Sequence, residues 1–213
     1  MNRMKKALLV VAVWLTLSAA AEGVTPVGQA PNGDAILRYE AENGQALFFT
    51  AREGDTLPMR SDVNFDGHPD LVFLTARGAA NFFYQFFLWS AGQYVYVLPP
   101  DESGLCNYEL YPDRGIVKTY RNDGAAGLEF EETLYRWDGA QLVPVAKAYG
   151  ASESEDTVAG GWYVRKVHTE RVVWRVTRGE STLWERVVSA EQADDPALWA
   201  DKDAALWAAA ESE

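Results

Sequence analysis

Four oxygen-bearing side chains follow one another at regular spacing in one short stretch of the chain. Asp62, Asn64 and Asp66 occupy alternate positions, Gly67 follows, and Asp70 completes the pattern D-x-N-x-D-G-x-x-D. Alternate oxygen side chains converge when a loop coils tightly around a cation, and a glycine permits the sharp backbone turn. Carboxylate, amide and carbonyl oxygens are hard ligands that suit calcium. The stretch therefore predicts a calcium site.

The expected ligands are the side chains of Asp62, Asn64, Asp66 and Asp70 and the backbone carbonyl of His68, whose imidazole should face solvent. Three carboxylates give this site a formal charge of −3, which one bound Ca²⁺ would reduce to −1. Without the ion, the carboxylates repel one another and raise each other's pKa. The alternative interpretation is a turn rich in Asp and Asn that binds no ion.

The residues after the motif distinguish this loop from an EF-hand. An EF-hand needs a bidentate Glu at its twelfth position, where this chain has Phe73, and it needs flanking helices. Residues 71–74 instead form an aliphatic and aromatic run that is typical of a strand. We therefore expect a calcium loop that leads into a β-strand.

The stretch from Asp62 to Asp70 resembles the calcium loop of FG-GAP/VCBS-type segments, known from integrin-like β-propellers. Together with residues 78–81 and 84–89, it resembles a group of small exported bacterial proteins that carry one such loop per chain. That group includes a periplasmic immunity protein of a bacterial-killing type IV secretion system, which binds calcium and inhibits lysozyme-like enzymes. The resemblance covers roughly residues 61–145 and is most specific at the loop. It implies calcium binding and, by analogy, a lysozyme-inhibitor-like role, whereas a single loop does not imply a full adhesive propeller.

Composition excludes several classes of protein. The 213 residues include 19 basic and 31 acidic ones, a net charge of −12, which argues against a nucleic-acid binder. One cysteine excludes an intramolecular disulfide framework and any CxxC-type metal site, and two histidines make a His-rich metal centre implausible. We interpret Cys106 as a buried thiol.

The first 21 residues predict a signal peptide. A basic start precedes the apolar stretch 7–17, and small residues follow at 18–21, with cleavage expected before Glu22. The apolar stretch is too short to span a membrane, and no cysteine follows it for a lipid anchor. We therefore expect an exported protein, periplasmic or secreted, whose mature chain has a net charge of −15 and is attracted to basic partners.

From residue 22 to 193 the pattern predicts a mainly β domain of antiparallel hairpins, packed as a sandwich or as a partial, propeller-like stack of sheets. Asn43-Gly44 and Asp138-Gly139 are strong hairpin turns. The expected strands are 36–39, 46–49, 71–75, 82–89, 94–98, 129–137, 141–145, 172–177 and 183–188. Ser152 to Asp156 is predicted to be an acidic loop or linker.

Residues 194–213 predict a C-terminal helix and tail. An Asp before Pro196 favours an N-cap with Pro in the first turn, and Trp199, Leu206 and Ala210 form one apolar stripe. A weak internal echo relates residues 89–97 to residues 137–145, each a Trp, a Gly-containing turn and alternating Val residues.

Two further patterns could bear on function. The aromatic run 82–89 fits a strand buried on both sides, with a sugar-stacking platform as the alternative. Glu129, Glu131 and Glu132 could serve a carboxylate-dependent hydrolase, but Glu129 and Glu131 share one face and are most simply a solvated edge. His168 lies at a hairpin-like junction with no nucleophile signature nearby.

The sequence thus favours an exported, calcium-binding, non-catalytic module that engages a protein partner. A lysozyme-inhibitor-like protein is one version of this hypothesis. Carbohydrate or cell-wall binding is the alternative, and a hydrolase is the less favoured one.

Overall fold

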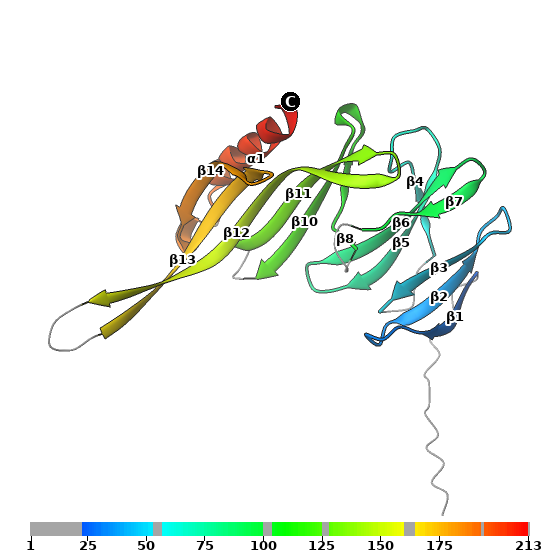
Figure 1. Ribbon diagram of the computed structural model, residues 1–213, viewed down its shortest axis with the longest axis horizontal. Coiled ribbons are helices and arrows are strands. Elements are labelled where there is room, and N and C mark those ends of the chain that lie inside the picture. Colours follow the sequence, from blue (N-terminus) through cyan, green and yellow to red (C-terminus); the bar gives the residue numbers. More distant parts are fainter. Residues whose placement is uncertain are drawn as a thin grey trace, which may run out of the picture.

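The structure is a computed structural model that describes residues 23–52, 57–99, 104–124, 128–159, 165–192 and 194–212, without the side chains of 154–159, 165–170 and 190. The predicted signal peptide lies outside the described residues. Three antiparallel sheets and one C-terminal helix make up the fold, which confirms the mainly β prediction (Figure 1).

Each sheet is built largely from neighbours in sequence. The first sheet has the order β1 (Val24–Gln29), β2 (Ala35–Glu40), β3 (Ala46–Ala51). The second has the order β4 (Met59–Ser61), β5 (Asp70–Arg77), β6 (Phe82–Ser90), β7 (Gln93–Tyr96), and β8 (Leu105–Cys106) also pairs with β6. The third has the order β14 (Ser181–Val188), β13 (Arg165–Arg178), β12 (Gln141–Ala159), β11 (Glu129–Asp138), β10 (Ile116–Gly124), β9 (Glu109–Tyr111).

Three apolar clusters join these layers in a row. Phe49 of the first sheet packs with Phe73 and Phe87 of the second. On the other face of the second sheet, Phe86 belongs to a cluster that includes Tyr135 of the third. The third sheet then packs against the helix through a third cluster. The three sheets and the helix therefore form a stack. Each layer needs a neighbour, because a sheet cannot bury its own apolar faces.

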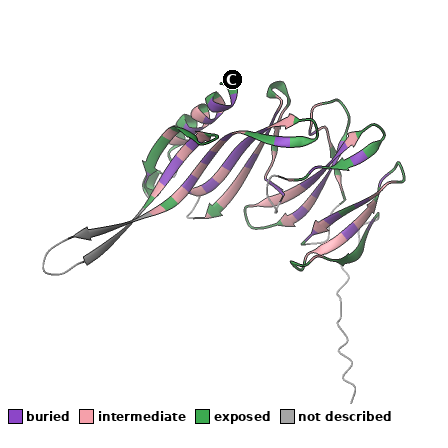
Figure 2. Ribbon diagram, in the orientation of Figure 1, coloured by how far each residue is buried: buried purple, intermediate pink, exposed green. Residues whose placement is uncertain are grey.

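The aromatic run lies in the middle of this stack. It forms β6, which has β5 on one side and β7 and β8 on the other. Residues 85–88 are buried, with Phe87 facing the first sheet and Phe86 facing the third (Figure 2). The prediction of a strand buried on both sides is confirmed, and this run does not offer an exposed platform for a sugar ring.

The predicted hairpins are present. Asn43-Gly44 joins β2 to β3, Asp138-Gly139 joins β11 to β12, and β13 turns into β14 at residues 178–181. The echo corresponds to two hairpins, β6–β7 and β11–β12, whose turns both contain a glycine with positive φ: 86° at Gly92 and 59° at Gly139.

The prediction of a loop at Ser152 to Asp156 is wrong. These residues lie within β12 and pair in continuous register with β13. His168, predicted to lie at a hairpin-like junction, lies within β13. The acidic character is compensated across the ladder, because Glu153 forms ion pairs with Arg175 at 2.6 Å and Arg171 at 3.3 Å. Opposite charges in facing positions stabilise a strand pair.

The helix, α1, spans Pro196–Glu211 and confirms the capping prediction. The side chain of Asp195 accepts a hydrogen bond from the Ala197 backbone N–H at 2.9 Å, and Pro196 occupies the first turn. Leu206 and Ala210 are buried, with Trp199 packed beside them. Within the described part of the chain, no helix is long and apolar enough to cross a membrane.

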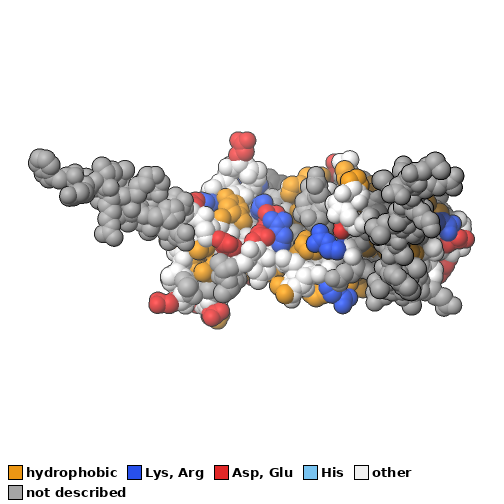
Figure 3. All heavy atoms as spheres, turned by 90° about the horizontal axis from the view of Figure 1, so that it is seen from below, with side chains coloured by type: hydrophobic (Ala, Val, Ile, Leu, Met, Phe, Trp, Pro, Cys, Tyr) orange, Lys and Arg blue, Asp and Glu red, His pale blue; other side chains and the backbone are white. Residues whose placement is uncertain are grey.

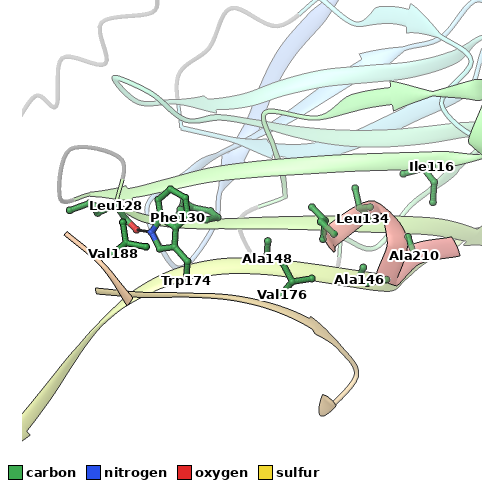
Figure 4. Close-up of a cluster of buried hydrophobic side chains, with 12 residues drawn as sticks. Ile116, Leu128, Phe130, Leu134, Ala146, Ala148, Trp174, Val176, Val188 and Ala210 are labelled. Carbon is green, nitrogen blue, oxygen red and sulfur yellow. Dashed lines mark hydrogen bonds between the residues drawn. The ribbon is translucent and has the colours of Figure 1, made fainter. Parts of the chain in front are cut away.

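The cluster beneath α1 centres on Trp174, which is fully buried and donates its indole N–H to the Leu128 carbonyl at 3.0 Å (Figure 4). Phe130 meets this indole edge-on, with ring centroids 5.1 Å apart. The hydrogen bond satisfies the one polar group that the indole carries into the core.

A buried ion cluster also holds α1 to the third sheet. Glu132 is only 2% exposed and forms ion pairs with Lys118, at 2.5 Å, and with Lys202 of the helix, which is 1% exposed. The Lys202 ammonium also lies over the ring of Trp199, 4.8 Å from its centroid. Burial alone would lower the pKa of Lys118, but the carboxylates of Glu132 and Glu109 together offset this effect and the pKa is raised.

The interpretation of Glu129 and Glu131 as a solvated edge also needs correction. They lie on β11, an interior strand of the third sheet, where Glu131 pairs with Lys147 at 2.8 Å and with Arg121 at 3.4 Å. Because adjacent residues of a strand point to opposite faces, Glu131 and Glu132 point away from each other.

The substitution Glu132→Gln should destabilise the fold by about 3–5 kcal/mol, because it leaves two lysines without their buried counter-charge. Glu131→Gln, on the same strand but more exposed, is the matched control and should cost about 1 kcal/mol or less. Urea unfolding of both variants measures the difference. Equal costs would show that the buried ion cluster is not what holds the helix.

Candidate metal centre

The predicted calcium loop connects β4 to β5. Residues 62–69 leave the edge strand β4 and return at Asp70, the first residue of β5. Two residues of the loop have left-handed backbone, Phe65 with φ of 64° and Gly67 with φ of 85°. The glycine was predicted at this sharp turn, and a side chain there would be strained even though the space around it is open.

The structure brings three of the predicted side chains into one turn. The Asp62 carboxylate accepts the backbone N–H groups of Asp66, at 3.1 Å, and of Gly67, at 2.9 Å. Asn64 accepts the Asp66 N–H at 3.3 Å and donates its amide N–H to the Asp66 carboxylate at 2.9 Å. These bonds curl the loop inward around its own oxygen atoms.

Asp66 and His68 lie on the solvent side of this turn. Both residues are exposed, and the Asp66 carboxylate accepts the backbone N–H of His68 at 2.9 Å. Burial raises the pKa of Asp66, but the hydrogen bonds from the His68 backbone and the Asn64 side chain together outweigh this effect and hold the pKa below its ordinary value. Asp66 is therefore a stable carboxylate.

Asp70 has a different environment from the other predicted ligands. Its side chain is fully buried, and its two oxygens accept the backbone N–H groups of Val63, at 2.9 Å, and of Trp89, at 2.8 Å. Burial raises the pKa of Asp70 in spite of these two donors, and the negative charges of Asp66 and Asp62 raise it further. The carboxylate thus ties the loop to β6.

The described residues contain no group of three or more His, Cys, Asp or Glu side chains that could hold a metal ion. An ion in this loop would therefore need the Asn64 amide oxygen and the His68 carbonyl beside the carboxylates. Such a mixed set is ordinary for calcium, which binds six to eight oxygens and commonly includes carbonyls and water. Each carboxylate oxygen that accepts one N–H keeps a second lone pair.

Sequence reasoning missed the residue that fixes the other side of the loop. The Trp137 indole, on β11 of the third sheet, donates to the Val63 carbonyl at 2.7 Å. Val63 is 0% exposed and packs with residues of the second and third sheets. The loop is thereby joined to two sheets at once. Trp137 stood out only as one end of the internal echo, a pattern that gives no sign of a contact 74 residues away.

Three asparagines form a second polar connection between the same sheets. Asn81 donates to the Asn122 carbonyl at 2.8 Å and accepts the Asn122 N–H at 2.9 Å. The side chain of Asn107 donates to the carbonyls of Ala80, at 2.9 Å, and Tyr120, at 3.0 Å. Cys106, beside it, is buried as predicted.

Trp137→Phe should destabilise the fold by about 1–3 kcal/mol more than Trp89→Phe, because it leaves the buried Val63 carbonyl without its donor. Trp89 occupies the equivalent place in the β6–β7 hairpin, so the control removes a similar aromatic area. Urea unfolding gives the two free energies. Hydrogen exchange at Val63 and Gly67 should accelerate in Trp137→Phe alone, and equal exchange in both variants would contradict a role in fixing the loop.

Neither a family model nor a curated protein matches the chain. Among solved structures, the chain is similar to a Xanthomonas type IV secretion system related protein, at 12% identity and a TM-score of 0.39, over 80% of this chain and 91% of that one. A likeness of this degree assigns neither a family nor a function.

Proposed function

We propose that this protein is an exported, calcium-stabilised, non-catalytic binding module that engages a protein partner. The observation that carries the calcium part is the inward turn of Asp62, Asn64 and Asp66, held against the sheets by the buried Asp70. These three side chains, the His68 carbonyl and Asp70 are the proposed ligands.

Electrostatics support an ion at this place. The negative charges of Asp62 and Asp66 raise the pKa of Asp70, which burial has already raised. A divalent cation among them would favour the ionised form of all three carboxylates. The gain would be largest for Asp70, because a buried charge is screened least by solvent.

A bound ion would stabilise a junction. Val63 is held between the Asp70 carboxylate and the Trp137 indole, so a rigid loop keeps the second and third sheets in register with each other. The role of calcium in this proposal is therefore structural.

The partner part rests on charge. A mature chain with a net charge of −15 attracts basic proteins and speeds their association. On the face shown in Figure 3, acidic and basic side chains are interspersed among apolar ones. A non-catalytic role is supported by Glu131 and Glu132, the hydrolase candidates, which are each paired with cations and point to opposite faces of β11.

Calcium should raise the unfolding midpoint of residues 22–213 relative to EDTA. At about ten times Kd, the linkage free energy is about 1.4 kcal/mol, or about 3–6 °C for a chain of this size. Asp66→Ala should lose this gain, whereas Asp201→Ala, at an exposed position of α1, should keep it. Calorimetry in millimolar calcium and in EDTA measures all three proteins, and an unchanged wild-type midpoint would refute the calcium-stabilised model.

The lysozyme-inhibitor version predicts that micromolar protein, with calcium present, slows cell-wall lysis by a basic lysozyme. Turbidity loss of a cell-wall suspension is the measurement. Unchanged lysis rates would remove this version and leave the calcium site unaffected.

A further inference from the structure

The free edge of β7, the outer strand of the second sheet, faces the turn that joins β2 to β3 (Figure 1). In the β6–β7 hairpin, Val95 lies opposite Leu88, and the Val97 N–H donates to the Phe86 carbonyl at 2.9 Å. Residues of an antiparallel strand bond alternately to either side, so the backbone groups at positions 92, 94 and 96 point to the free edge. Their partners must come from another part of the chain or from water.

The Gln45 side chain takes the place of a paired residue on this edge. Its amide oxygen accepts the Tyr94 N–H at 2.7 Å, and its amide nitrogen donates to the Tyr94 carbonyl at 2.8 Å. Two directly opposed residues of an antiparallel ladder exchange the same two hydrogen bonds. At the previous outward position, the Asn43 amide donates to the Gly92 carbonyl at 3.0 Å. These two side chains, here called the cap, thus replace a short neighbouring strand.

The turn that carries the cap is held in place from three sides. The Asn43 side chain accepts the Gln45 backbone N–H at 3.1 Å, which fixes the turn itself. Glu42 forms an ion pair with Arg60 of β4 at 2.6 Å. Ala41 is buried in the same apolar cluster as Tyr94. The cap is therefore in position whenever the first sheet is docked on the second.

The sequence of the capped strand is the kind that pairs readily with further strands. Residues 93–98 read Gln-Tyr-Val-Tyr-Val-Leu and contain no charged residue, proline or glycine. Uncharged segments of high β propensity add strands from other chains when their edge is open. The side chains of Val95, Tyr96 and Leu98 are exposed, so such pairing would also remove apolar surface from water.

Other outer strands are protected by their own sequences or by a neighbouring sheet. Strand β14 carries Glu185 and Arg186, and the extended ends of β12 and β13 are also charged, which hinders pairing at an edge. Strand β1 contains Pro26 and an irregularity in its pairing. The chain that leaves the uncharged β3 is joined to β5, because the Arg52 N–H donates to the Thr75 carbonyl at 2.8 Å. The protection of β7 comes from side chains of another sheet.

We propose that the cap is a built-in block against self-association, and that an uncapped β7 pairs with the β7 strand of a second copy of the chain. Two-fold antiparallel pairing suits this strand, because an uncharged strand meets no like charge in its copy. Each Tyr94 would regain both of its hydrogen bonds from the opposite strand. A basic partner protein is a poorer occupant, because residues 93–98 offer no charge to attract it.

The experiment compares Gln45→Ala with Gln29→Ala in the chain of residues 22–213. Gln45→Ala removes both bonds to Tyr94, whereas Gln29→Ala removes a bond to the Gly33 carbonyl, at 2.9 Å, within its own turn. Sedimentation velocity over a range of protein concentrations measures self-association. The association constant of Gln45→Ala should exceed that of wild type by about tenfold or more, and that of Gln29→Ala should lie within about twofold of wild type.

The double variant Q45A/V95K shows which surface associates. It has lost the same two hydrogen bonds, but two paired copies would bring like charges together on β7. Val95 is exposed, so a lysine at this position reaches water. Q45A/V95K should therefore associate no more strongly than wild type. Association as strong as that of Gln45→Ala would show that partial unfolding, and not pairing of β7, is the cause, and the inference would be wrong.

Amide exchange of the wild-type protein tests the cap without any variant. The Tyr94 amide should exchange at least about tenfold more slowly than the Tyr96 amide, because the outward N–H of Tyr96 has no acceptor among the residues that the structure describes. Equal exchange at the two tyrosines would overturn the inference even if Gln45→Ala folds poorly. A folded Gln45→Ala that associates no more than wild type would also overturn it.

Discussion

The buried carboxylate of Asp70 is the constraint on which the centre of this molecule depends. A charge that is fully removed from water is costly unless hydrogen bonds compensate it, and here two backbone N–H groups do so, from Val63 and Trp89. These two residues lie on opposite sides of Asp70, one in the loop and one at the end of β6. The carboxylate can be satisfied only when the loop is folded back onto β6. The third sheet is joined at the same place, because the Val63 carbonyl accepts a hydrogen bond from the indole N–H of Trp137 on β11.

Polar contacts recur at each place where layers meet, although apolar clusters supply most of the burial. Asn81 and Asn107 connect the second and third sheets, and Glu132 with Lys202 connects the third sheet to α1. Apolar packing is not directional, so by itself it would tolerate sliding of one sheet over another. A hydrogen bond or a buried ion pair fails when its partner moves by a few tenths of a nanometre, and such contacts therefore fix the register of the layers.

Structural elements that are determined by a few neighbouring residues could be predicted from the sequence. Asn43-Gly44 and Asp195-Pro196 encode a turn and a helix start within a few residues, and both are present. Strand β10 was missed, because Ile116–Gly124 alternates poorly and is a strand through pairing on both sides. The acidic run at Ser152 to Asp156 was misread for the same reason, since its compensating arginines lie on β13. At the candidate site the loop residues were found from spacing, but Trp137 was not, because nothing near it in sequence marks a contact with Val63.

Strand β12 begins beside the loop and runs to the far end of the third sheet. Leu142, near its start, packs in the same cluster as Val63, and its last residues pair with β13. Leu142 and Glu155 are thirteen positions apart, about 43 Å along a strand. An ion in the loop would thus act on that end of β12 only through the third sheet. The third sheet has a core of its own under α1, so calcium would secure the junction of the second and third sheets and leave that core unchanged.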